Sequence, residues 1–162
     1  CVALLVRFDN RGTILWQHQT ADGYSFSELL PAQGKDGSFL LAINDDGTRG
    51  RSRTRLAFLY PEQNDARESI LAVKFDGMAR SLIATREGGY AMSGVHAAAS
   101  SPPDTGWFYL LDARGCTVRE EHFKEYPDVL LQNREGDFLL AGSGENSSVP
   151  GWWLIKLARN GK

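Results

Sequence analysis

Residues 44–55 hold a dense group of charged side chains whose spacing could support ligand binding. Four arginines alternate there with small residues, at positions Arg49, Arg51, Arg53 and Arg55. Guanidinium groups bind carboxylate, sulfate and phosphate through paired hydrogen bonds, so this pattern suits an anionic ligand such as an acidic glycan. Arginines in a solvated loop also pair with neighbouring acids. The sequence leaves both interpretations open.

Acidic side chains suggest two further kinds of chemistry. Asn44, Asp45 and Asp46 offer oxygen ligands of the kind that Ca²⁺ takes, without the spacing of an EF-hand loop. Glycoside hydrolysis would need two carboxyl groups about 5 to 10 Å apart. The candidates for such a pair are Asp22, Asp76, Asp104 and Glu145. No local pattern marks any two of them as partners.

The histidines and cysteines give little sign of a reactive centre. His18, His96 and His122 fall on different predicted elements, with His96 in a loop and the other two on outer strands. Zinc sites usually show regular ligand spacing, so we predict no metal site. Cys116 follows a turn glycine and is expected to be a structural or surface thiol. Motifs for a nucleophile elbow, a phosphate loop or a dinucleotide site are absent, and we predict no cofactor.

Composition narrows the class of protein. The chain has 162 residues, with 18 Lys and Arg against 20 Asp and Glu. This near-neutral balance argues against a nucleic-acid partner, which requires a clearly basic surface. The apolar runs are short, so no membrane span is expected. A hydrophobic content of 42% and a charged content of 23% are typical of a folded domain.

An internal repeat organises the chain. Residues 35–42, 86–94 and 134–142 resemble one another, and their aromatic positions, Phe39, Tyr90 and Phe138, lie 51 and 48 residues apart. A second element alternates with the first along the chain. It lies at residues 3–12, 107–115 and 152–161, with a degenerate copy at 56–61. Each unit therefore consists of four short apolar runs, separated by glycine-containing turns of the kind that tight hairpins use.

These segments resemble the blades of bacterial β-propeller repeat proteins. Residues 152–161 match a W-W-L-I-K-L-D-x-N-G motif, residues 13–16 match I-L-W, and residues 87–94 match D-G-G-Y-I-L-A-G. The chain is also similar, more distantly, to quinone-dehydrogenase-like and Kelch-like propellers. The resemblance implies an all-β fold whose blades each contain four antiparallel strands, with ligands bound by loops on one rim.

The repeat predicts thirteen strands within a single β-propeller-type domain spanning residues 1–162. A hairpin covers 2–19, full blades cover 26–75 and 79–123, and three strands of a further blade cover 129–157. These make about three blades, too few for a closed ring. We expect either the remainder of a larger propeller or a homo-oligomer in which a second copy completes the ring. An open sandwich or another β fold is the remaining alternative.

The chain begins with Cys1, as a mature lipoprotein would, or as an internal boundary of a longer chain would. The compartment stays open, with a secreted or periplasmic location slightly favoured. Trp16, Trp107, Trp152 and Trp153 occupy repeat positions, which favours packing between blades over a sugar-stacking platform.

The long loops of one rim, at residues 44–55, 96–106 and 143–151, are the expected carriers of function. Their candidate ligand-binding residues are Asp45, Asp46, Arg49, Arg51, Arg53, His96, Asp104 and Glu145. We predict a non-catalytic binding or scaffold module with a protein or glycan ligand. The alternative is a fragment of a propeller enzyme, either a glycan hydrolase or lyase or a quinone-type dehydrogenase.

Overall fold

The chain folds into short antiparallel sheets in the computed structural model, which describes residues 4–19, 27–45, 52–61, 66–96, 105–144 and 151–159. Thirteen strands and no membrane-spanning helix occur within these residues. The strands are β1 (Leu4–Phe8), β2 (Ile14–Gln19), β3 (Glu28–Gln33), β4 (Phe39–Asp45), β5 (Arg53–Pro61), β6 (Ala66–Asp76), β7 (Met78–Ala84), β8 (Tyr90–Val95), β9 (Gly106–Leu111), β10 (Thr117–Phe123), β11 (Val129–Gln132), β12 (Phe138–Gly144) and β13 (Gly151–Leu157).

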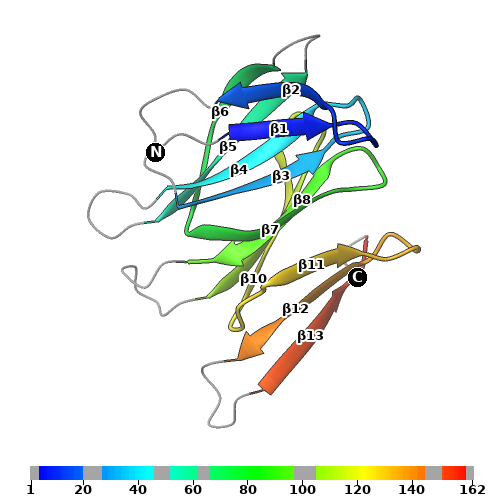
Figure 1. Ribbon diagram of the computed structural model, residues 1–162. Coiled ribbons are helices and arrows are strands. Elements are labelled where there is room, and N and C mark those ends of the chain that lie inside the picture. Colours follow the sequence, from blue (N-terminus) through cyan, green and yellow to red (C-terminus); the bar gives the residue numbers. More distant parts are fainter. Residues whose placement is uncertain are drawn as a thin grey trace.

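The strands form four sheets that follow one another in chain order (Figure 1). The first sheet contains β1 and β2, the second β3 to β6, the third β7 to β10, and the fourth β11 to β13. Every pairing is between consecutive strands and is antiparallel. The all-β class, the strand count and the grouping predicted from the repeat are therefore confirmed.

Glycine-containing turns connect the strands of each sheet as the sequence predicts. In the turn before β4, Gly34 donates its N–H to the Ser38 carbonyl and accepts from the Gly37 N–H, and Gly37 has a φ of 84°. The same pattern closes the turns that contain Gly12, Gly88, Gly115 and Gly136. A three-residue hairpin of this kind needs a left-handed conformation at its last residue, which glycine adopts without steric cost.

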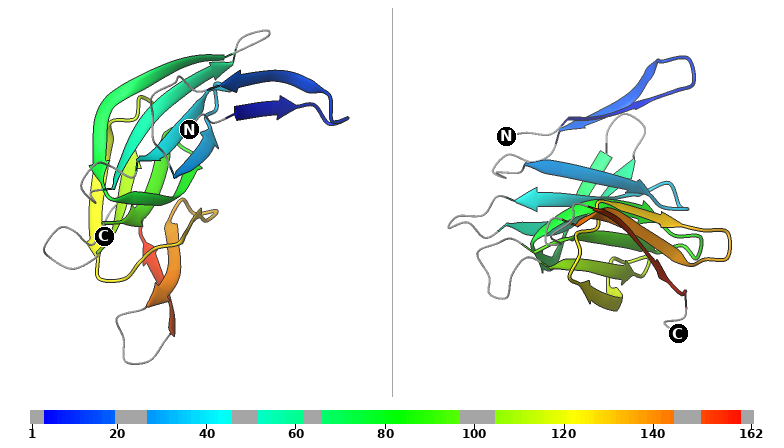
Figure 2. Two further views of the ribbon diagram at one scale, coloured as in Figure 1. Left: turned by 60° about the vertical axis from the view of Figure 1, so that its left-hand side comes forward. Right: turned by 90° about the horizontal axis from the view of Figure 1, so that it is seen from below.

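Successive sheets follow one another as stacked layers (Figure 2). The apolar core lies between them. The first sheet packs on the second through Trp16 and Leu41. The second packs on the third through Leu56 and Trp107, and the third packs on the fourth through Phe108 and Leu140. Because strand side chains alternate, each four-stranded sheet contributes one face to the layer before it and the other face to the layer after it.

Tryptophans occupy equivalent positions on the third strand of two sheets. Trp107 lies against Gly94 and Trp153 against Gly142, where any side chain in place of hydrogen would overlap the indole ring. Trp16 and Trp107 are buried and Trp153 packs against the last core layer, which confirms their packing role. Trp152 differs, since 89% of its surface is exposed.

The two ends of the stack carry exposed apolar side chains. Leu154 on the fourth sheet is equivalent in strand pairing to Leu56 on the second sheet and Phe108 on the third. Leu56 and Phe108 are fully buried by the next sheet, whereas 69% of Leu154 is exposed. We call this outer face of the fourth sheet, with Val129, Leu131, Trp152 and Leu154, the C-terminal face. Leu4, Phe8 and Ile14 are exposed on the first sheet at the opposite end of the stack, which we call the N-terminal face.

Candidate functional site

The long connections of the second, third and fourth sheets all emerge at one end, as the repeat predicts. Asp45 pairs with Arg53 across the β4–β5 connection, and Val95 pairs with Gly106 across the β8–β9 connection. The tight β6–β7 turn at Gly77 lies at the same end, because Arg53 also pairs with Asp76. We call this end the upper rim. It places side chains from separate repeats within reach of one another.

Three predicted site residues lie within the described part of the chain. Asp45 ends β4, Arg53 begins β5, and His96 directly follows β8. The other five, Asp46, Arg49, Arg51, Asp104 and Glu145, lie outside the described residues. The strands reach further into the first predicted loop than expected, because Asn44 belongs to β4 and residues 53–55 belong to β5.

Both described arginines of the predicted anion site contact carboxylates. Arg55 Nη2 lies 3.2 Å from Asp45 Oδ2, and Arg53 Nε lies 3.9 Å from Asp76 Oδ1. The Arg55 pair is largely shielded from solvent, whereas the Asp76 side chain is 86% exposed. For these two positions the structure therefore favours the interpretation in which the arginines pair with neighbouring acids.

Asn44 has a structural role in place of the calcium-binding one considered from the sequence. Its side chain is fully buried, and Nδ2 donates to the Ala79 carbonyl at 2.8 Å. Its Oδ1 accepts from the Ala79 N–H at 2.9 Å and lies 2.8 Å from the Thr54 hydroxyl. The amide thus satisfies both backbone groups of Ala79, which ties the second sheet to the first strand of the third.

A cluster of titratable side chains lies beside the upper rim, on the third sheet. The imidazoles of His96 and His122 stack with their centroids 5.5 Å apart and their planes 13° from parallel. His122 Nε2 lies 2.6 Å from Glu120 Oε1, which also accepts the Tyr109 hydroxyl hydrogen bond at 2.9 Å. We call His96, His122, Glu120 and Tyr109 the histidine cluster.

Strand register explains why these residues meet. His122 pairs with Trp107, and Glu120 pairs with Tyr109. These two residues of β9 and two of β10 therefore project from the same face of the sheet. This face packs against the second sheet, where Phe75 contacts the Tyr109 ring at a centroid distance of 4.7 Å. The cluster therefore occupies the junction between two repeats, with its inner side packed and its outer side open to solvent.

The environment sets the charge of each group in the cluster. Burial lowers the pKa of His96, and the neighbouring His122 lowers it further, against the opposing effects of Asp76 and Glu120. The hydrogen bonds from His122 and then Tyr109 lower the pKa of Glu120. Burial, followed by the Glu120 hydrogen bond, raises the pKa of Tyr109. Near neutral pH the cluster therefore combines a neutral imidazole, an ionised carboxylate and a protonated phenol.

The sequence interpretation placed the three histidines far apart and missed the pairing of His96 with His122. The sequence did contain a signal for this pairing. When the repeats are aligned, the second and fourth strands of a four-stranded unit end at the same rim, which brings His96 and His122 to that rim. His18 lies elsewhere, on β2, where its Nε2 is 3.6 Å from Glu68 Oε2 of β6. Among the described residues, no three His, Cys, Asp or Glu side chains are grouped as metal ligands would be.

Comparison with known protein families gives no match, and a search of curated proteins also gives none.

Proposed function

We propose that this chain is a non-catalytic binding module built from β-propeller-type blades, and that its ligand contacts the upper rim at the histidine cluster. The observation that carries the proposal is the position of this cluster. The stacked rings and hydrogen-bonding groups stand on β9 and β10 and at the end of β8, yet His122 and Glu120 each have nearly half of their side-chain surface exposed. Rigid strands with exposed polar groups provide a pre-organised surface for a glycan or a protein.

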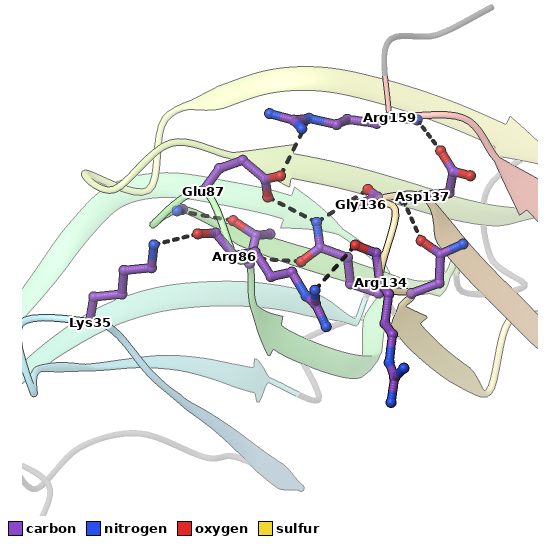
Figure 3. Close-up of polar contacts among 11 residues, drawn as sticks. Lys35, Arg86, Glu87, Arg134, Gly136, Asp137 and Arg159 are labelled. Atoms are coloured by element: carbon purple, nitrogen blue, oxygen red, sulfur yellow. Dashed lines mark hydrogen bonds and ion pairs between the residues drawn. The ribbon is translucent and has the colours of Figure 1, made fainter.

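The propeller-type arrangement is supported by contacts that repeat between the turns at the end opposite the upper rim (Figure 3). Lys35 Nζ donates to the backbone carbonyl of Arg86, one repeat further along. Arg86 Nη1 in turn donates to the backbone carbonyl of Arg134 at 3.2 Å. A basic residue in each turn thus contacts the equivalent residue of the next turn. Such stepwise equivalence is what successive blades around a common axis would produce.

A further blade of the same repeat is the partner that suits the C-terminal face. The apolar side chains there correspond to ones that the next sheet buries in both preceding layers. Arg134 is equivalent in its turn to Lys35 and Arg86, each of which donates a hydrogen bond to the next turn. The remainder of a larger propeller and a second copy of the chain would both provide such a blade.

Glu120, the carboxylate of the histidine cluster, does not favour the enzyme alternative. A glycosidase needs one carboxyl group that is protonated near neutral pH and serves as the general acid. Glu120 has the opposite tendency, because hydrogen bonds from His122 and Tyr109 favour its ionised form. Its Oε1 is also engaged by both of these neighbours, which suits a residue that orients the cluster.

Glycan-array binding by the purified chain tests the proposed function. We expect a defined set of oligosaccharides to bind the wild type and to bind the His96→Ala, His122→Ala double variant at least tenfold more weakly. Arg114→Ala, in an exposed turn at the other end of the third sheet, is the control and should bind normally. Equal binding by the wild type and the double variant would refute a role for the cluster. Turnover of a bound glycan would favour the enzyme alternative.

A further inference from the structure

A cavity of about 320 Å³ lies between the third and fourth sheets, at the end opposite the upper rim. Apolar side chains form its walls, among them Leu110, Val118 and Phe138. Glu87, Gln132 and Arg159 provide polar groups at its lining. Small-molecule sites have this character, with an apolar interior, a few convergent polar groups and a volume from about 300 Å³ upwards.

The equivalent region between the second and third sheets is filled by aromatic rings. Phe58 and Leu110 occupy equivalent positions in their sheets. Phe58 pairs with Leu40 and Leu110 pairs with Ala91, and these two partners are equivalent in the repeat. The Phe58 ring stacks on Tyr60 at 5.8 Å and meets the Tyr90 ring edge-on at 6.0 Å. At the next junction the smaller Leu110 and the short Asp112 replace Phe58 and Tyr60. The cavity is therefore a local difference between two repeats that otherwise pack alike.

The polar groups at the cavity are held in place by contacts with neighbouring turns (Figure 3). Gln132 Nε2 donates to Glu87 Oε2 at 2.9 Å, and Gln132 Oε1 accepts the Arg86 N–H at 2.8 Å. Arg159 Nε lies 3.3 Å from Glu87 Oε1. Glu87 is thus fixed by two partners of the fourth sheet, Gln132 at the end of β11 and Arg159 after β13. Its hydrogen bond from Gln132 lowers its pKa and keeps it ionised.

The charges that line the cavity have an excess of one sign. Glu87 and Asp112 are the acidic residues of the described lining, and Arg159 is the single basic one. Arg159 offsets Glu87, and Asp112 then leaves the lining with a net negative charge, although its Oδ1 also accepts the Arg114 and Cys116 N–H groups of its own turn. A ligand that enters with a positive charge and an apolar body would match both features.

We propose that this cavity is a binding site for a small organic cation, in which an ammonium group is joined to an aromatic or branched apolar body. The apolar body would lie against Leu110, Val118 and Phe138, and the ammonium group would lie toward the carboxylates of Glu87 and Asp112. This site is separate from the upper rim, so it is independent of the function proposed there.

Titration of the full chain with phenethylammonium, followed by two-dimensional NMR or calorimetry, tests the proposal. We expect saturable binding with a dissociation constant of about 1 mM, the affinity range of so small a ligand. Phenylacetate has a similar body and the opposite charge, and it should bind at least tenfold more weakly. Glu87→Gln should weaken phenethylammonium binding roughly fivefold, because it removes a charge at a partly exposed site.

Leu110→Phe introduces the residue of the preceding repeat and should fill the cavity, so it should abolish binding. The same substitution at an exposed position, Leu154→Phe, is the control and should leave binding unchanged. If Leu110→Phe fails to fold, Val118→Phe at the exposed side of the cavity replaces it. Absence of saturation up to about 10 mM would overturn the proposal. Equal affinity for phenylacetate, or full binding by the cavity-filling variant, would also overturn it.

Discussion

His96 and His122 lie with their imidazole rings stacked 5.5 Å apart, although one follows the second strand of a repeat and the other lies on the fourth. The pairing links the pH response of the protein to its upper rim. Protonation of both rings would place two positive charges in contact, and burial already disfavours the charged form of His96. The neutral form of His96 is therefore the stable one near neutral pH.

The first prediction concerns the pH dependence of stability. The pKa of His96 is lower in the folded protein than its ordinary value of 6.5, so the unfolded chain binds the proton more readily. The resulting stabilisation is present above pH 6.5 and is lost as the pH falls below it. Urea unfolding at pH 7.5 and pH 5.0 should show a smaller decrease for His96→Gln than for the wild type. An identical decrease in both would contradict the assignment.

The second prediction concerns Asn44. Replacing it with alanine leaves the buried Ala79 carbonyl without its donor and removes one of the two acceptors of the Ala79 N–H, which keeps Thr54 Oγ1. We therefore expect a loss of about 2 to 4 kcal/mol in unfolding free energy. Asn133→Ala is the matched control. That side chain accepts the Asp137 N–H in a part-buried turn, and its loss should cost about 1 kcal/mol or less. Chemical denaturation of the two variants measures the difference, and equal costs would argue against the buried role of Asn44.

The third prediction compares two glycines. A methyl group at Gly94 would lie 2.2 Å from the Met78 carbonyl oxygen and 2.3 Å from the Trp107 ring, so Gly94→Ala should unfold the third sheet or cost more than about 3 kcal/mol. Gly37→Ala meets no neighbour within 4 Å, and its cost should be about 1 kcal/mol, from its φ of 84° alone. Thermal unfolding followed by circular dichroism separates the two cases.

The fourth prediction concerns the C-terminal face. In a solution of the isolated chain, the partner available to this apolar face is another copy, and its N-terminal face is also apolar. We expect self-association that increases with concentration. Leu154→Lys should shift the equilibrium toward the monomer. Val73→Lys, on β6, should leave it unchanged. Analytical ultracentrifugation gives the masses, and a monomeric wild type at all concentrations would refute this use of the face.

The strand arrangement was predictable because it depends on local patterns that repeat. Each turn carries its glycine at the position that needs a left-handed conformation, as Gly37, Gly88 and Gly136 do. Alternating apolar residues between these turns determine where each strand begins and which side chains share a face. All four tryptophans were predicted to pack between blades on the same grounds, and three do. The prediction is wrong for Trp152, which is exposed on the last sheet because no described sheet packs over it.

The candidate site was only partly predictable, because its members interact across sheets. His96 was predicted as a rim residue, but its partner depends on how β8 and β10 end at the same height. For Arg53 and Arg55 the sequence left open whether they bind an anion or pair with acids. Their carboxylate partners come from the two strands beside β5, Asp76 on β6 and Asp45 on β4. Distances between such groups depend on strand twist and sheet stacking, which leave no mark in the local sequence.

By itself, then, the sequence determined the all-β class, the thirteen strands, their hairpin turns and their order in four sheets, because period-two alternation and turn glycines act within a few residues. Only the tertiary structure decided the burial of Asn44, the histidine cluster, and the cavity where Leu110 stands in the place of Phe58. These features arise where one repeat packs on the next. Packing there depends on the volumes and charges of both partners, and neither repeat specifies it alone.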